Sequence, residues 1–187
     1  MATILITGTN KGVGLELVKI YAARGDTVIA TCRDPESASA LSEVSGAVEV
    51  LGVSVGDDAS VASLAKALEG RVIDVLINNA GTSGPARDQQ TTFAMDFEGW
   101  ADAFNINSMA PVRVMQALLP NLRLSSAAKV MTVTSQMGAL SLDMPAAHAY
   151  CATKAAVNKF MRLAALDLKK ENIAVGLVHP GWVKTDM

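Results

Sequence analysis

Residues 4–14, ILITGTNKGVG, decide the fold of this chain. The apolar run 4–6 predicts a strand, the glycine spacing G-x-x-x-G-x-G predicts a tight turn, and residues 15–21 resume with a pattern typical of a helix. A strand–turn–helix unit of this kind presents backbone N–H groups to a phosphate at the positive end of a helix, and glycine lets a pyrophosphate approach closely. A plain glycine-rich hairpin is the alternative. We expect a dinucleotide-binding turn made by Gly8, Asn10, Lys11, Gly12, Val13 and Gly14.

The composition of the chain predicts a single domain, residues 1–187, that binds a small ligand. Half of the 187 residues are hydrophobic, which is enough for a sizeable core, and the net charge of −2 argues against a basic surface for nucleic acid. Cys32 and Cys151 have neither disulfide nor metal-ligand spacing and are expected to be reduced thiols. The sequence shows no basic leader and no window of about 18 apolar residues, so we expect a cytoplasmic protein without a membrane partner.

Apolar runs of strand length alternate with stretches of helical period along the rest of the chain. Strands are predicted at residues 27–31, 48–53, 72–77, 130–134 and 173–178, and helices at 58–68, 98–106, 109–122 and 150–169, with Pro35 opening a short helix. The run 72–77 is nearly all apolar, as expected for a central parallel strand that is covered on both faces. This rhythm predicts an α/β doubly wound parallel sheet, a Rossmann fold with three α/β/α layers.

The end of the second strand predicts the form of the dinucleotide. An acidic residue at this place accepts hydrogen bonds from the ribose 2′-OH of NAD, whereas a basic residue accommodates the 2′-phosphate of NADP. The strand ends at Cys32 and is followed by Arg33, while Lys11 lies in the glycine turn. These two cations favour NADP over NAD. The alternatives are that both are solvated surface charges, or that Asp34 is the acid, although it stands about two residues too late.

Residues 78–81, Asn-Asn-Ala-Gly, follow the fourth strand. Small residues at the carboxyl end of a central strand leave room for a ligand, and asparagine side chains can hold the neighbouring backbone. Asn79 is therefore either part of a ligand site or only a tie between strands.

A serine, a tyrosine and a lysine carry the candidate chemistry. Ser135 ends the fifth strand, while Tyr150 and Lys154 lie four residues apart at the start of the long helix, on one helical face. A phenol with a pKa near 10 is a poor acid–base group at neutral pH, but a nearby ammonium favours the phenolate. We expect Tyr150 to protonate a carbonyl oxygen that Ser135 holds, with Lys154 lowering the pKa of the phenol.

Together the motifs resemble those of the short-chain dehydrogenase/reductase family. The resemblance spans practically the whole chain, through TGTNKGVG, NNAG, the strand end at Ser135, YCATK at 150–154 and HPGWVKT at 179–185. It implies NAD(P)-dependent carbonyl or alcohol chemistry with Ser135, Tyr150 and Lys154 as catalytic residues. Asn107 matches the family's fourth catalytic position, which helps to hold a proton-relay water beside the lysine, and Asn105 is the nearest alternative.

The same resemblance implies further contacts with the cofactor. Ser54 and Val55 would contact the adenine, although Ser54 stands where many members have Asp. Val183 and Thr185 would contact the nicotinamide amide. The other implied contacts lie on the ribose side or in the motifs named above: Asn79, Ala80, Gly81, Tyr150, Lys154, Pro180 and Gly181.

Within the family, residues 10–14 and 32–34 look most like NADPH-dependent carbonyl reductases and the C-factor-like and sniffer-like proteins. We therefore expect an NADPH-dependent reductase of small or lipophilic aldehydes and ketones. The alternative is a dinucleotide-binding regulator or signal precursor of the C-factor type with vestigial catalysis. The intact pair of Ser135 and Tyr150 favours the enzyme, because a binding module has no need of both.

Two expectations concern assembly and the end of the chain. Relatives continue past residue 187 into a lid segment and a seventh strand, so we expect a longer gene product. Without these pieces strand 173–178 would be an edge with its apolar residues open to water, namely Ile173, Val175, Leu177 and Val178. The helices that start near residues 109 and 150 carry apolar residues beyond one stripe, which predicts a homodimer or homotetramer: Met115, Leu118, Val157, Phe160, Met161, Leu163 and Leu166.

Overall fold

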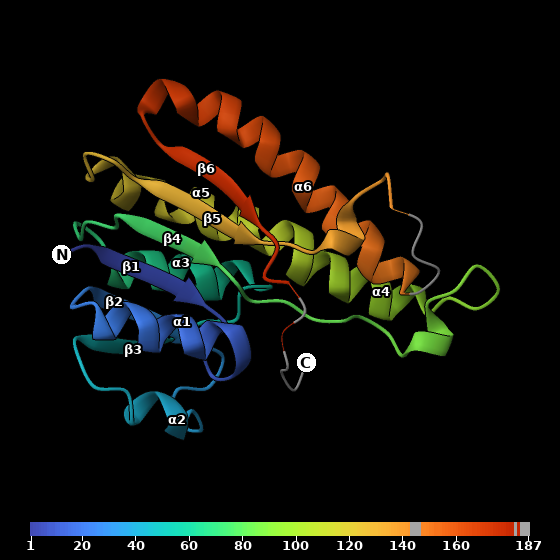
Figure 1. Cartoon of the computed structure of the whole chain (residues 1–187), viewed down its shortest axis with the longest axis horizontal. Coiled ribbons are helices and arrows are strands. Elements are labelled where there is room, and N and C mark those ends of the chain that lie inside the picture. Colours follow the sequence, from blue (N-terminus) through green and yellow to red (C-terminus); the bar gives the residue numbers. More distant parts are fainter. Residues whose placement is uncertain (143–146, 182, 184–187) are drawn as a thin grey trace.

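Six parallel strands form one sheet in the computed structural model, which describes residues 1–142, 147–181 and 183 (Figure 1). Each strand is parallel to its neighbours, and the order across the sheet is β3-β2-β1-β4-β5-β6. This order confirms the predicted doubly wound α/β sheet. The strands are β1 (Thr3–Thr7), β2 (Thr27–Cys32), β3 (Val48–Gly52), β4 (Val75–Asn78), β5 (Lys129–Val133) and β6 (Ala174–Val178).

The strand order reverses between β1 and β4, at the centre of the sheet. Leu5 of β1 lies opposite Ile29 of β2 on one side and Leu76 of β4 on the other, and all three side chains are fully buried. Because all strands are parallel, the loops that follow them meet at one edge of the sheet. Where the order reverses, neighbouring loops diverge and leave a crevice that suits a ligand.

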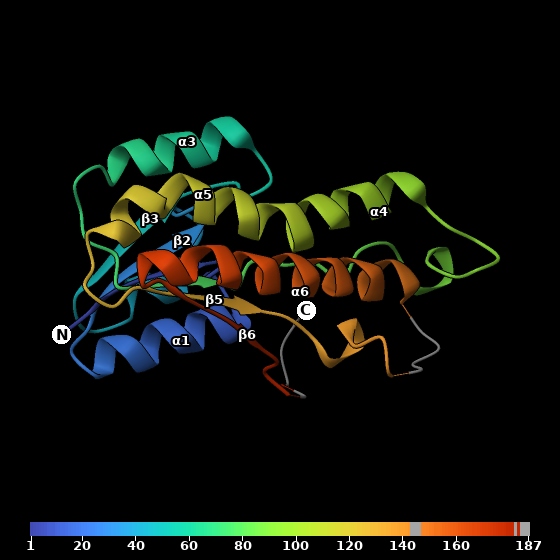
Figure 2. The same cartoon turned by 90° about the horizontal axis from the view of Figure 1, so that it is seen from above.

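Helices cover both faces of the sheet (Figure 2). Helices α3 (Asp58–Ala67), α5 (Ala110–Arg123) and α6 (His148–Leu168) pack on one face, where Leu118 and Met161 join Leu5 in a core cluster. Helix α1 (Gly12–Ala23) packs on the other, where Val18 and Ile6 of β1 belong to a second core cluster, and Leu41 of the short α2 (Ser39–Ser42) joins it. The result is the predicted three-layer α/β/α arrangement. None of these helices, within the described residues, is long and apolar enough to span a bilayer.

The predicted helices 98–106 and 109–122 join into one helical segment, so the predicted break between them is wrong. Helix α4 (Phe97–Phe104) continues through a π-helical turn (Asn105–Met109) into α5. The polar residues Asn107 and Ser108 interrupt the apolar period, but their side chains are buried and bonded to Thr82 and Thr153. π turns inside helices are frequently found at functional sites.

Several predicted boundaries are shifted. Helix α6 begins at His148, so Tyr150 is its third residue and not its first. Strand β4 begins three residues late: the Asp74 carboxylate accepts hydrogen bonds from the β1 backbone and from Ser125, and residues 72–74 form a connection. Helix α2 starts at Ser39, later than the predicted proline position.

The apolar residues expected at the surface divide into two groups. Ile173 at the sheet edge is buried, contrary to expectation, while Val175 and Leu177 of β6 are half-buried and Val178 is 41% exposed. On the helices, the core takes up Met115, Leu118, Val157 and Met161, whereas Phe160, Leu163 and Leu166 of α6 are exposed. The helical period alone does not separate the buried from the exposed residues of these helices, because α5 and α6 each contact neighbours on more than one side.

We expect Leu118→Ala to lower the free energy of unfolding by about 2–5 kcal/mol, because Leu118 is fully buried in the core beneath α5 and the change leaves a cavity. Leu124→Ala at the end of the same helix is the control, since Leu124 is 53% exposed and should change stability by less than about 0.5 kcal/mol. Urea unfolding measures both. Equal effects of the two changes would contradict the packing described here.

Candidate active site

The glycine turn lies at the carboxyl end of β1 and is bound to the end of β2. Gly8 and the next residue both donate their N–H groups to the Thr31 carbonyl, at 2.9 and 3.1 Å. Gly8 (φ +71°) and Gly12 (φ +58°) have the left-handed backbone that favours glycine. A Cβ at Gly14 would overlap the Gly8 carbonyl oxygen and lie 2.6 Å from the Asn79 side-chain nitrogen. The turn therefore requires glycine at all three positions of the predicted motif.

Helix α1 begins inside this turn, at Gly12. Its N-cap residue, Lys11, has an extended backbone and does not cap the helix with its side chain. Asn10 and Lys11 are exposed and Val13 is half-buried. The first N–H groups of a helix have no partner within the helix, and its N-terminal end carries a partial positive charge, so this end of α1 suits an anionic group.

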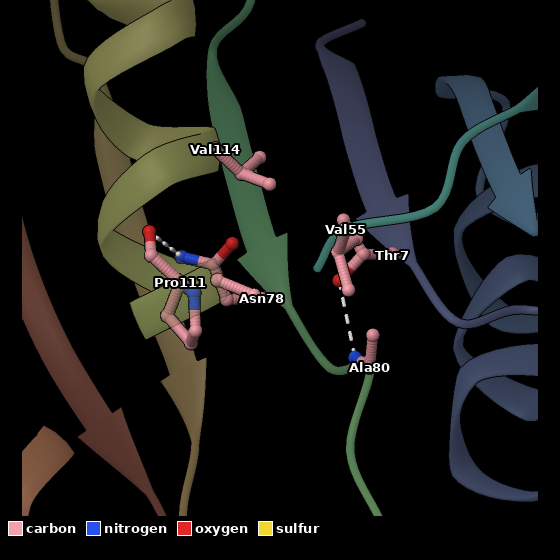
Figure 3. A pocket seen from close by; sticks show the side chains of 7 residues that line it. Thr7, Val55, Asn78, Ala80, Pro111 and Val114 are labelled. Carbon is pink, nitrogen blue, oxygen red and sulfur yellow. Dashed lines mark hydrogen bonds between the residues drawn. The ribbon is translucent and has the colours of Figure 1, made fainter. Parts of the chain in front are cut away.

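A group of hydrogen bonds joins the ends of β1 and β4 (Figure 3). Thr7 Oγ1 accepts the N–H groups of Asn79 and Ala80 at 3.0 and 3.1 Å, and Asn79 Nδ2 donates to the carbonyls of Thr7 and Gly8, both at 2.9 Å. A Cβ at Gly8 would lie 2.7 Å from Ala80 Cα, so the two loops are in direct backbone contact. Asn79 is therefore the tie between strands that the sequence allows, and its contact with a ribose stays a prediction.

A small cavity lies between this tie and α5 (Figure 3). Asn78 Nδ2 donates to the Pro111 carbonyl at 3.3 Å, while Asn78 Oδ1 accepts no hydrogen bond within the described part of the chain. Val55, which is expected to contact the adenine, is 8% exposed, and its side chain lines the cavity. Any contact of Val55 with a ligand outside the core would therefore involve mainly its backbone. The cavity is lined by Thr7, Val55, Asn78, Ala80, Ala110, Pro111 and Val114.

The tip of β2 presents Arg33 to solvent, directly after the buried Cys32. The competing acid, Asp34, accepts the Glu36 N–H at 3.2 Å, and a hydrogen bond with Ser37 holds the pKa of the Asp34 carboxyl below its ordinary value. Asp34 is thus engaged in the turn that follows the strand. Arg33 therefore stays the cation expected at the tip of β2, and its contact with a 2′-phosphate stays a prediction.

The loop 54–56 after β3 is held by the long helical segment. Arg113 donates to the Val55 carbonyl and to Asn105 Oδ1, both at 3.0 Å, and is paired with Asp58. Asn105 Nδ2 donates in turn to the Gly56 carbonyl at 2.9 Å. Ser54, the first residue of this loop, is exposed. Asn105, the alternative for the fourth catalytic position, therefore has a structural role in positioning the loop.

Ser135, Tyr150 and Lys154 lie together where the end of β5 meets the first turns of α6. The Ser135 hydroxyl lies close enough to the Tyr150 phenol to lower its pKa, and Ser135 Oγ accepts the Met137 N–H at 3.1 Å. Lys154 Nζ lies 5.7 Å from the centre of the Tyr150 ring and donates to the Val133 carbonyl at 3.1 Å. The fold thus brings a phenol, a hydroxyl and an ammonium to one place.

Burial controls the pKa values of this pair. Burial raises the pKa of the Tyr150 phenol, and the hydrogen bond with Ser135 lowers it by less. Burial also lowers the pKa of Lys154 from 10.5 to about 8. The pKa of the phenol is raised overall, because desolvation outweighs the effects that favour its ionisation, and the expectation that Lys154 lowers this pKa stays a prediction.

Asn107 is held on several sides within the π turn. Its Oδ1 accepts the Thr82 N–H at 2.9 Å, while its Nδ2 donates to the Thr82 carbonyl at 2.8 Å and to Thr153 Oγ1 at 3.0 Å. A Cβ at Gly81 would lie 3.2 Å from Asn107 Oδ1 and 3.7 Å from Lys154 Nζ. Asn107 and Lys154 both border Gly81, and the Asn107 side chain is engaged by protein, so its role in holding a relay water stays a prediction.

The remaining predicted contacts lie in the last part of the chain. Pro180, Gly181 and Val183 follow β6 and are exposed, and Thr185 lies outside the described residues. Several residues that shape the site were not singled out by the sequence. Thr7 and Thr153 lie inside the motifs TGTNKGVG and YCATK and could have been found there. Arg113 and Gln90 bind partners distant in sequence and belong to no local pattern.

The family model described as short chain dehydrogenase matches residues 2–187. The chain belongs to the short-chain dehydrogenase family. This finding confirms the resemblance inferred from the motifs, and it agrees with the six-stranded parallel sheet.

Three members of the short-chain dehydrogenase family illustrate what this chain is similar to. The C-signal protein of Myxococcus xanthus is 43% identical over 116 residues, which are 62% of this chain and 68% of that protein. The structure of NADPH-bound carbonyl reductase from chicken fatty liver is 29% identical with a TM-score of 0.91, over 100% of this chain and 82% of that one. The carbonyl reductase Sniffer of D. melanogaster is 27% identical with a TM-score of 0.91, over 100% and 83%.

The depressed pKa of Lys154 predicts a pH-dependent stability. Between pH about 8 and 10.5 the unfolded chain binds a proton at this lysine that the folded chain has lost, so its contribution to the free energy of unfolding rises with pH in that window. Lys154→Met removes this pH-dependent contribution, because methionine has no ionisable amine. We expect its stability relative to the unmodified protein to fall by about 2 kcal/mol from pH 7 to pH 9.5 in urea unfolding. A difference that does not vary with pH would contradict the burial of an ionisable amine.

Proposed function

We propose that this short-chain dehydrogenase is an NADPH-dependent reductase of small or lipophilic aldehydes and ketones. The observation that carries the proposal is that Ser135 and Tyr150 lie together beside the buried Lys154 at the end of β5. A protein that only bound the dinucleotide would need the glycine turn but not this arrangement. The similarity to two carbonyl reductases supports the same reaction class.

The residues at the carboxyl edge of the sheet fit a nicotinamide dinucleotide. The left-handed glycines and the start of α1 suit the pyrophosphate, and Arg33 with Lys11 suits a 2′-phosphate. A side chain at Gly81 would approach both Lys154 and Asn107, so a residue with no side chain keeps this place open. When bound, NADPH supplies the hydride that is added to the carbonyl carbon.

The protein's own groups supply the proton and hold the oxygen. Because burial raises the pKa of Tyr150, its phenol is protonated at neutral pH and can donate to the substrate oxygen, which the Ser135 hydroxyl holds. The phenolate left behind is stabilised by the Lys154 ammonium 5.7 Å from the ring. The pKa of about 8 at Lys154 allows this amine to pass a proton on near neutral pH. Asn107 has its amide bound by protein, so it would hold a relay water through its backbone carbonyl.

Assembly and location belong to the same proposal. Phe160, Leu163 and Leu166 form an exposed apolar strip on α6, and this supports a homodimer or homotetramer. Cys32 and Cys151 form no disulfide, which supports a reducing compartment such as the cytoplasm.

The second candidate function is a dinucleotide-binding regulator or signal protein, and the similarity to C-signal favours it. The two candidates differ in one measurement. A reductase consumes NADPH in the presence of a carbonyl compound, whereas a regulator with vestigial catalysis binds NADPH without turnover across a panel of aldehydes and ketones.

We expect Tyr150→Phe to abolish NADPH consumption and to leave the dissociation constant for NADPH within about twofold, because it removes the proton donor without disturbing the glycine turn. Tyr21→Phe is the matched control, since Tyr21 lies on α1 under Arg24, away from the site, and should retain full turnover. Absorbance at 340 nm follows the reaction. Substantial turnover by Tyr150→Phe on a carbonyl that the unmodified protein reduces would refute the assigned mechanism.

We expect Arg33→Asp to invert the cofactor preference, because a charge-assisted contact with the 2′-phosphate contributes about 1.5–3 kcal/mol. The dissociation constant for NADPH should rise by roughly tenfold or more, while that for NADH should fall. Lys66→Asp on the exposed end of α3 makes the same change in net charge and should alter neither value. Equal affinities of the unmodified protein for the two cofactors would rule out this role for Arg33.

A further inference from the structure

Gln90 is a buried polar residue outside the motifs described above. It is 2% exposed and lies in the segment 79–96 between β4 and α4, which runs beside the start of α6 (Figures 1 and 2). A buried amide is costly unless its donors and acceptor find partners. The Gln90 side chain meets this requirement by bonding to two segments of the chain that are distant in sequence.

On one side Gln90 holds its own segment. Its Nε2 donates to the carbonyl of Ser83 at 3.2 Å and to that of Pro85 at 2.6 Å. The Gln90 backbone also forms an antiparallel bridge with Met95. Near its start, Thr82 of the same segment donates its N–H to Asn107 Oδ1 at 2.9 Å. Gln90 therefore belongs to a loop that is bound at both ends and across its middle.

On the other side Gln90 caps α6. Its Oε1 accepts the N–H of Tyr150 at 3.2 Å, and its backbone carbonyl accepts the N–H of His148 at 3.1 Å. The N-cap residue of α6 is Ala147, whose methyl group cannot accept a hydrogen bond and whose backbone is left-handed (φ 53°). The first N–H groups of a helix lack partners within it, so Gln90 supplies the acceptors that a local cap would otherwise provide.

We propose that Gln90 is a positioning residue for Tyr150, which it places by capping the first turn of α6 from the segment between β4 and α4. The inference rests on the proposed function, in which Tyr150 gives the proton. The next turn of α6 has its own contacts, through Lys154 on the Val133 carbonyl and Thr153 on Asn107. Thr153 Oγ1 also donates to the Tyr150 carbonyl at 2.7 Å, so Gln90 is the remote partner on the N–H side of Tyr150. Loss of the Gln90 bonds would therefore displace Tyr150 from Ser135 and leave Lys154 in place.

Gln90→Met tests the proposal, because methionine keeps a similar length without any hydrogen bond. Gln89→Met, at the exposed neighbouring residue, is the matched control. We expect Gln90→Met to lower kcat for carbonyl reduction by about tenfold or more, since small displacements of reacting groups have effects of this size, and to change the NADPH dissociation constant by less than about twofold.

A second measurement is independent of turnover. The chain has two tyrosines, Tyr21 and Tyr150, so ultraviolet titration at alkaline pH follows both, and Tyr150→Phe assigns them. Because burial is the largest cause of the raised pKa of Tyr150, opening the first turn should lower that pKa towards about 10 in Gln90→Met. Gln89→Met should leave it unchanged.

The outcomes separate a positioning role from a merely structural one. A Gln90→Met protein that is less stable but keeps the kcat and the Tyr150 titration of the unmodified protein would overturn the proposal. If Gln90→Met does not fold, Gln90→Asn withdraws the acceptor by one methylene group and should show the same two changes, and their absence there would also overturn it. An unmodified protein that reduces no carbonyl compound would end the proposed function, while the titration would still decide the role of Gln90.

Discussion

The hydrogen bonds between Thr7 and Asn79 are the interaction on which the rest of the site depends. They join β1 to β4 at the point where the strand order reverses, and neighbouring loops would otherwise diverge there. The contact brings the backbone of Gly8 against Ala80, so the glycine turn and the Asn-Asn-Ala-Gly loop form one surface. Because Gly81 follows directly, the same tie determines how closely this surface approaches the candidate catalytic lysine.

Helix α6 is the element on which the two halves of the site meet. Its Thr153 receives a hydrogen bond from the π turn through Asn107, and its Asn158 accepts the Thr134 hydroxyl at 2.6 Å and donates to the Gly138 carbonyl at 3.3 Å. These last two bonds hold both flanks of Ser135. Buried polar groups that are fully bonded in this way favour a single arrangement, because any other arrangement leaves some of them without partners. The geometry of the serine and the tyrosine is thus set by side chains that take no part in the chemistry.

Burial shifts the pKa values of the two titrating groups of the site in opposite directions, up for Tyr150 and down for Lys154. It favours the neutral phenol at Tyr150 and the neutral amine at Lys154, since both charged forms lose hydration. A protonated acid and an amine that ionises near neutral pH suit the delivery of one proton and its replacement. The same burial lowers stability at neutral pH, where the lysine is largely charged, which is the kind of compromise that functional sites often contain.

The sequence by itself determined the doubly wound sheet and the glycine turn, and it singled out Ser135, Tyr150 and Lys154 as candidate catalytic residues, because strand and helix periods and the order of motifs are local properties of the chain. Only the tertiary structure decided the features that depend on which surfaces meet. Asn107 interrupts the apolar pattern yet points inward, and Met115 and Met161 are core residues, because each contacts an element distant in sequence. The raised pKa of Tyr150 and the capping of its helix by Gln90 have the same origin, since burial and a remote hydrogen-bond acceptor arise only when the chain has folded.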